Sequence, residues 1–178
     1  MKFLQCNTDN AKAISHLFNE TFTASEGVDE GKVIGELTTE LMCTTASEDL
    51  FIFVAIEADT LAGCIMFSKL TFATGINAFI LSPVAVQPSF QRQGVGQKLI
   101  QFGLDSLQSK GVELAFTYGD PNYYSKVGFK QISEEVVKAP QALTYPEGWL
   151  SLSLTGDELQ PVIGRCSCVA ALNKAEYW

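Results

Sequence analysis

The sequence predicts a mixed α/β (α+β) fold, in which a mostly antiparallel central sheet is flanked by helices. Three observations support this class. Short runs rich in aromatic and β-branched residues alternate with turn residues, as strands do. Longer segments carry apolar residues at helical spacing. The turn Glu57–Thr60 joins two consecutive runs as a hairpin, which makes that pair of strands antiparallel.

Three long helices are expected. Thr8 or Asp9 can cap the first, and Ser25–Gly27 separates it from the second. The third runs from about Gly94 to Lys110, and Gly111 ends it. The inward-facing residues are Ile14, Leu17, Phe18 and Phe22 in the first helix, Val33, Ile34, Leu37 and Leu41 in the second, and Leu99, Ile100, Gly103, Leu104 and Leu107 in the third.

Six runs are predicted as strands, and Pro83 interrupts the fourth of them. Asp120 and Pro121 start a short helix, and Gly128 breaks that helix before a further strand. The chain after Lys138 is loop-rich, apart from one alternating segment. The six runs are Phe3–Cys6, Phe51–Ile56, Leu61–Leu70, Ala78–Val86, Val112–Tyr118 and Trp149–Leu154.

The charge of the chain is unevenly distributed. The formal net charge is −8, which argues against a nucleic-acid backbone as a partner. Residues 1–60 hold 3 Lys and 11 Asp or Glu, giving −8, whereas residues 91–130 hold 5 Lys or Arg and 3 acids, giving +2. Two interpretations are open: ordinary solvated surfaces, or an anionic ligand near the middle of the chain and a cationic one near the first helices.

The composition also indicates where the protein resides and whether it holds a metal or disulfides. No apolar run reaches the roughly 20 residues that a membrane span needs, and the N-terminal segment does not resemble a signal peptide, so a cytoplasmic protein is expected. The five cysteines show no spacing typical of a metal site, and no disulfide framework is expected. Cys6, Cys43 and Cys64 lie in apolar patterns and are expected to be buried. His16 is expected at the polar edge of the first helix.

Two glycines stand where the third helix begins, although glycine is a poor helix former. A strand, a glycine-containing turn and a helix together form a common phosphate-binding arrangement, because the first amides of a helix have no partner within it. The dinucleotide-binding fingerprint fails here, since Leu99 occupies the position of its third glycine, and no P-loop motif is present. The pattern that fits is Gln91-x-x-Gly94-x-Gly96.

This pattern, which follows Leu81–Val86, resembles the acyl-CoA-binding motif Gln/Arg-x-x-Gly-x-Gly/Ala of the GNAT superfamily of N-acetyltransferases. A second stretch, Tyr118–Phe129, is similar to the later Tyr-x-x-x-Gly-Phe motif of that family. The resemblance covers about residues 50–132. Within the superfamily, Leu81–Val86 together with Gly119–Tyr124 resembles a subgroup of uncharacterised bacterial acetyltransferases. The resemblance implies a GNAT-like fold whose sheet is splayed at a β-bulge, and a single N-acetyltransferase domain over 1–178, with a core at about 1–137 and an extension at 138–178 packing on it.

The resemblance also implies site residues for acetyl-CoA. Tyr124 is expected to be the general acid that protonates the leaving thiolate, or else to pack the cofactor without proton transfer; Tyr123 is the neighbouring alternative. The strand that precedes the motif carries no acid, so Glu26 is the leading candidate for the base, although a solvated loop acid is an alternative reading of it. No metal is expected. The cofactor-binding residues implied are Val84, Ala85, Val86, Gln91, Arg92, Gln93, Gly94, Val95, Gly96, Gln97 and Tyr123.

The expected function is therefore transfer of an acetyl group from acetyl-CoA to a primary amine by direct attack. The acidic N-terminal part favours a cationic acceptor, such as a polyamine, an aminoglycoside or a peptide amine. The alternative is a catalytically weak acyl-CoA-binding or sensor module of the same fold. The extension at 138–178 is expected to pack on the sheet of its own domain. Two alternatives are that it closes over the acceptor site or that it forms the surface of a homodimer.

Overall fold

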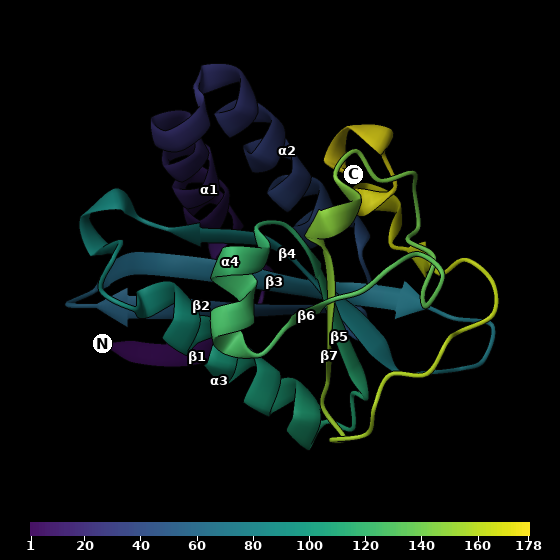
Figure 1. Ribbon diagram of the computed structural model, residues 1–178. Coiled ribbons are helices and arrows are strands. Elements are labelled where there is room, and N and C mark those ends of the chain that lie inside the picture. The colour runs from purple at the N-terminus through teal and green to yellow at the C-terminus, as the bar shows by residue number, and fades with distance from the viewer. The chain divides into compact units, whose positions relative to one another are not determined.

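The computed structural model describes residues 1–178 and contains every long helix and every strand expected from the sequence (Figure 1). Short 3₁₀ turns lie between these elements. The α-helices are α1 (Ala11–Glu26), α2 (Val28–Thr44), α3 (Val95–Ser109) and α4 (Pro121–Tyr124). The strands are β1 (Lys2–Cys6), β2 (Leu50–Glu57), β3 (Thr60–Thr71), β4 (Ala78–Val86), β5 (Leu114–Tyr118), β6 (Lys130–Gln131), β7 (Trp149–Ser153) and β8 (Ser167–Cys168).

The strands follow the order β1-β2-β3-β4-β5-β7-β6, and β8 pairs with β3. The pairs β1–β2, β3–β8, β5–β7 and β6–β7 are antiparallel, and β4–β5 is parallel, so the expected mixed fold with a mostly antiparallel sheet is confirmed. The chain divides into two compact units. The first comprises Met1–Phe67 and Pro83–Gly103, and the second comprises Ser68–Ser82 and Leu104–Trp178.

In the first unit, α1 and α2 lie side by side, and β1 pairs with β2 from Lys2↔Ile56 to Cys6↔Ile52 (Figure 1). Most of the residues expected to face inward on α1 and α2 are buried, which favours folding by about 1.5–3 kcal/mol for each large side chain, whereas Phe22 and Val33 are only half-buried. Phe53 joins the strands to α3, since its ring meets those of Phe67 and Phe102 edge-on at 6.1 and 5.9 Å.

Two expectations for the first unit were wrong. Thr8 and Asp9 do not cap α1, because both lie in a 3₁₀ turn before it, in which the Asp9 amide donates to the Asn7 side chain at 3.1 Å. Asn10 precedes α1 without a side-chain cap. Cys43 is exposed, because the apolar pattern around it belongs to the opposite face of α2.

In the second unit, β5 is the central strand. It pairs in parallel with the first half of β4, from Ala78↔Leu114 to Leu81↔Thr117, and antiparallel with β7. The expected strand at Trp149–Leu154 is therefore confirmed as β7. Its first residue anchors the aromatic core: the Trp149 ring stacks on that of Phe116 at 5.1 Å, and its indole N–H donates to the Val137 carbonyl at 2.9 Å.

Element ends differ slightly from the expectation. The third helix stops at Ser109 rather than Lys110, and β5 starts at Leu114 rather than Val112. The cause is the turn at Gly111, where the Val112 amide bonds back to the Leu107 carbonyl at 3.1 Å. The division of the chain into a core at 1–137 and an extension at 138–178 stays a prediction.

Candidate active site

The loop between β4 and α3 carries the first motif, and its glutamines build the loop itself. The chain leaves β4 at Val86, makes a 3₁₀ turn and enters α3 at Val95. The Gln91 side-chain amide donates to the Val86 carbonyl at 2.9 Å, and that of Gln93 donates to the Ser89 carbonyl at 3.0 Å. The first bond ties the loop to the end of β4 and the second lies within the loop, so the loop has a defined shape.

Two residues of this loop have left-handed backbone conformations. Gly94 has φ +76°, and Arg92 has φ +60°. A non-glycine residue in this region is disfavoured by about 1–2 kcal/mol, and such strain is often found at functional sites. A Cβ added to Gly94 would meet no protein atom within 4 Å, so the glycine is required by its backbone angle.

The first turn of α3 follows directly. The first helical bond runs from the Lys98 amide to the Gly94 carbonyl at 3.1 Å. The amides of Val95, Gly96 and Gln97 precede it, and a helix offers such amides no internal acceptor. The helix dipole adds partial positive charge at this end. The structure thus brings the loop and these three amides together as a potential anion-binding site.

The strand before the loop alternates in exposure. Ala85 is buried, whereas Val84 and Val86 are partly exposed. The ladder between β4 and β5 covers only Ala78–Leu81, although β4 continues to Val86. This early end of the ladder agrees with the expected splay of the sheet.

The second motif lies in the second unit, where Tyr124 ends α4. Asp120 caps this short helix, as its carboxylate accepts a bond from the Asn122 amide at 2.9 Å; this cap is as expected. The Tyr124 ring packs edge-on against Phe129 at 5.9 Å and against Tyr123 at 5.1 Å. The contact with Phe129 packs α4 against the segment that leads into β6, and the cap stabilises the first turn of α4.

The Tyr124 hydroxyl has a strongly altered acidity. Burial raises its pKa to about 12; a side-chain hydrogen bond with Thr117 lowers it, and the charges that Tyr123 and Asp120 can carry raise it. Burial also raises the pKa of Tyr123. Tyr124 is therefore protonated at neutral pH, as a proton donor must be.

Glu26 is placed differently from these residues. It is the last residue of α1, it is exposed, and Gly27 follows it with φ +103°. It belongs to the first unit, as do residues 84–86 and 91–97, whereas Tyr123 and Tyr124 belong to the second. Thr117, whose side chain lowers the pKa of Tyr124, was missed by the sequence analysis; its only signal was a polar residue within a buried strand.

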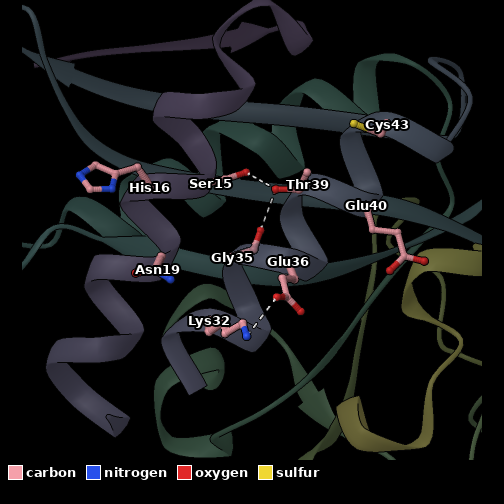
Figure 2. A pocket seen from close by; sticks show the side chains of 9 residues that line it. All are labelled: Ser15, His16, Asn19, Lys32, Gly35, Glu36, Thr39, Glu40 and Cys43. Atoms are coloured by element: carbon pink, nitrogen blue, oxygen red, sulfur yellow. Dashed lines mark hydrogen bonds and ion pairs between the residues drawn. The ribbon is translucent and has the colours of Figure 1, made fainter. Parts of the chain in front are cut away.

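A groove of about 500 Å³ also lies on the α1–α2 surface (Figure 2). The Ser15 and Thr39 hydroxyls bond each other at 2.8 Å within it, and the Thr39 hydroxyl donates to the Gly35 carbonyl at 2.9 Å. Lys32 and Glu36 form an exposed ion pair at 3.9 Å on its rim. These hydroxyls are engaged in joining the two helices, so the groove is first of all a packing feature.

Comparisons with known proteins agree with the two motifs. Residues 48–131 match the family model described as an acetyltransferase (GNAT) domain. The match covers just under half of the chain, and over these residues the chain is similar to a GNAT acetyltransferase domain. The match spans β2 to β6 and so includes both the loop at 91–97 and Tyr124, whereas Glu26 lies outside it.

Individual proteins are similar to this chain in sequence or in fold. The chain is 31% identical over 103 residues to the "Uncharacterized N-acetyltransferase YjhQ" of Escherichia coli K12, covering 54% of this chain and 57% of that protein. Among solved structures, it is similar to E. coli YhbS in complex with CoA, with TM-score 0.79 and 23% identity over 97% of this chain and 92% of that one. A GNAT family acetyltransferase of Brucella melitensis in complex with acetyl-CoA gives TM-score 0.74 and 25% identity over 96% and 97%.

No helix in the chain is both long and apolar enough to cross a membrane. No group of three or more His, Cys, Asp or Glu side chains is arranged to hold a metal ion.

Proposed function

We propose that this GNAT domain transfers an acetyl group from acetyl-CoA to a primary amine. The observation that carries the proposal is the glycine-turned loop at the start of α3, which offers backbone amides to an anion and lies inside the GNAT match. The acetyl-CoA and CoA complexes of the Brucella and E. coli proteins support the choice of ligand.

The pyrophosphate of acetyl-CoA is assigned to the loop and first turn, residues 91–97. Oxygens of a phosphate accept hydrogen bonds from helix N-terminal amides, and the Arg92 guanidinium adds a positive charge. Backbone groups of Val84, Ala85 and Val86 would hold the pantetheine arm, and an amide there would polarise the thioester carbonyl, which is an oxyanion-hole role. Only backbone atoms are asked to act on this strand, so its apolar side chains are compatible with the role.

In the proposed reaction, the neutral amine attacks the acetyl carbonyl carbon, a C–N bond forms, and the C–S bond breaks. The amine gives up a proton to a base, and the departing thiolate takes a proton from the Tyr124 hydroxyl; solvent then restores both groups. Tyr123 is the alternative donor. An alkyl ammonium with a pKa near 10.4 is almost entirely charged at neutral pH, so a base is needed. Glu26 is proposed for this step.

The acceptor is proposed to be a cationic amine, because residues 1–60 carry a net charge of −8. A cytoplasmic location and a homodimer stay predictions.

The test combines binding with turnover. Calorimetric titration should show heat for acetyl-CoA and CoA and none for NAD. A screen of polyamines, aminoglycosides and peptide amines, read by thiol release, should then find an acceptor. With that acceptor, Tyr124→Phe should lower kcat about 10²-fold or more, while the acetyl-CoA Kd stays within threefold.

Two results would change the proposal. Acetyl-CoA binding without turnover of any amine would favour the sensor module of the same fold. Absence of binding to both CoA species would refute the acetyl-CoA role and leave the loop as a structural turn.

A further inference from the structure

A cavity of about 620 Å³ lies in the second unit of the chain, beside the edge strand β6. Its lining comes from three parts of the chain: β6 with the residues around it, β7, and the segment that follows β7. The segments that follow the two strands are tied to each other, because the Val162 amide donates to the Val136 carbonyl at 2.8 Å. A cavity of this size is typical of a small-molecule site.

One buried hydroxyl in the lining has no partner. Ser151 lies in β7, and only 5% of its surface is exposed. It lines the cavity, and its hydroxyl makes no hydrogen bond to a protein group. A hydroxyl withdrawn from water costs free energy unless another group bonds it. A ligand in the cavity would supply that bond, and Ser151 has a proton to donate to it.

A cation stands next to this hydroxyl. Lys130 in β6 is directly opposite Ser151 in the β6–β7 ladder, so both side chains leave the same face of the sheet, with Cβ atoms about 5 Å apart. Lys130 also lines the cavity, and it forms no ion pair within the chain. Hydrogen bonds to a charged acceptor are roughly twice as strong as those between neutral groups. The pair is therefore suited to hold a carboxylate.

A series of hydrogen bonds orients a carboxylate in the same lining. The Thr155 hydroxyl donates to Asp157 Oδ2 at 2.9 Å and accepts from the Asp157 amide at 3.3 Å. Its single proton is thereby used, so the Ser153 hydroxyl, 3.2 Å away, must be the donor in the bond between the two hydroxyls. Asp157 and its neighbour Glu158 both line the cavity, which gives it two groups suited to hold an ammonium.

The rest of the lining includes four aliphatic side chains that the fold leaves only half-buried. A ligand with an apolar body would cover surface that now meets solvent, which favours binding. These residues are Ile132, Val136, Leu152 and Leu159.

We infer that this cavity binds a short aliphatic peptide with both ends free. Its carboxylate is held by Ser151 and Lys130, its ammonium by Asp157 and Glu158, and its side chains lie on the aliphatic lining. The inference concerns binding alone, and it does not depend on the proposed acetyl transfer.

The probe is the dipeptide Leu-Leu, titrated into the ¹⁵N-labelled full chain and followed by ¹H–¹⁵N NMR. The Kd should be about 1 mM or tighter. The largest shifts should fall on amides of residues 128–136 and 151–159, which contain the lining. N-acetyl-Leu-Leu lacks the ammonium and Leu-Leu amide lacks the carboxylate, so each should bind at least about fivefold more weakly than Leu-Leu.

Variants of the chain test the same contacts. Ser151→Ala and Lys130→Gln should each weaken Leu-Leu binding at least about fivefold. Ser68→Ala is the matched control and should bind like the unaltered chain, because Ser68 is a buried serine of the same unit whose hydroxyl also has no partner but which does not line the cavity. Asp157→Asn, at an exposed position, should weaken binding similarly and keeps the test open should Ser151→Ala fail to fold.

Three results would overturn the inference. They are the absence of shifts at about 10 mM Leu-Leu, equal binding of a blocked dipeptide, and unaltered affinity in the Ser151, Lys130 and Asp157 variants. Binding that is lost in Tyr124→Phe but kept in Ser151→Ala would place the dipeptide at the proposed catalytic residue and would also overturn it. Leu-Leu binding as expected, in a chain that binds neither acetyl-CoA nor CoA, would uphold the inference and refute the proposed acetyl transfer alone.

Discussion

Replacing Gly94 by alanine tests whether this glycine serves only the fold or also the binding of acetyl-CoA. Gly94 has φ +76°, and alanine there costs about 1–2 kcal/mol because its Cβ crowds the backbone in this conformation. No protein atom within 4 Å adds a clash. For a chain of this size, that loss corresponds to a fall in Tm of about 2–8 °C.

The chain offers a closely matched control. Gly75, in the turn between β3 and β4, has φ +77°, and a Cβ there would also meet nothing within 4 Å. Gly75→Ala should therefore cost the same stability as Gly94→Ala. The two variants differ in the proposed ligand contact alone, since Gly94 leads into the first amides of α3 and Gly75 has no assigned role.

The expected result is a difference in binding with equal stability. Gly94→Ala should weaken acetyl-CoA binding at least tenfold, equivalent to about 1.4 kcal/mol, because the added Cβ holds the pyrophosphate away from the amides. Gly75→Ala should bind within twofold of the unaltered chain. Circular dichroism melts give the Tm values and calorimetric titration gives the Kd. If both variants bind with unaltered affinity, the loop does not hold the pyrophosphate.

Two further predictions concern stability. Trp149→Phe keeps most of the stacking but leaves the Val137 carbonyl without its indole donor, so urea unfolding should show a loss of about 1–3 kcal/mol, and a loss under 0.5 kcal/mol would contradict the bond. Burial raises the pKa of the Cys166 thiol from 9.0 to about 12. As the pH rises, the thiol therefore ionises in the unfolded chain before it ionises in the folded one. The free energy of unfolding should be unaffected by this group below pH 9 and should fall as the pH rises toward 12. Cys166→Ala should reduce that alkaline decline, and a decline of unchanged slope would refute the assignment.

Most helices and strands could be predicted from the sequence because the pattern that marks each of them lies within a single segment. The periodicity of α1, α2 and α3 and the alternation of β7 each reflect one face packing on a core, and a single segment is enough to read them. The misplaced cap shows the limit of this approach. Asn7, Thr8 and Asp9 are all good caps, and the choice among them depends on the 3₁₀ turn that the chain makes before α1.

The motifs alone name Gln91, Gly94 and Tyr124 as candidate site residues, and the roles assigned to them stay predictions. The bond between Thr117 and Leu81 could not be predicted from the sequence, because Leu81 lies 36 residues earlier in the chain and the bond exists only once β4 and β5 have paired. Gly119 is similar: its close approach to Tyr124 depends on how α4 folds back after β5.

The first motif specifies the shape of a loop more than a set of contacting side chains. The Gln91 and Gln93 amides are both engaged by backbone carbonyls of the preceding residues, and Gly94 supplies a backbone angle. What is left to bind an anion is the main chain at the start of α3 and the charge of Arg92. A motif of this kind can keep its ligand while neighbouring side chains vary, since the amides are present in any sequence that keeps the turn. It follows that variants which preserve the turn, such as replacements at the exposed Lys98, should leave the loop shape intact, whereas a side chain at Gly94 strains the turn by about 1–2 kcal/mol.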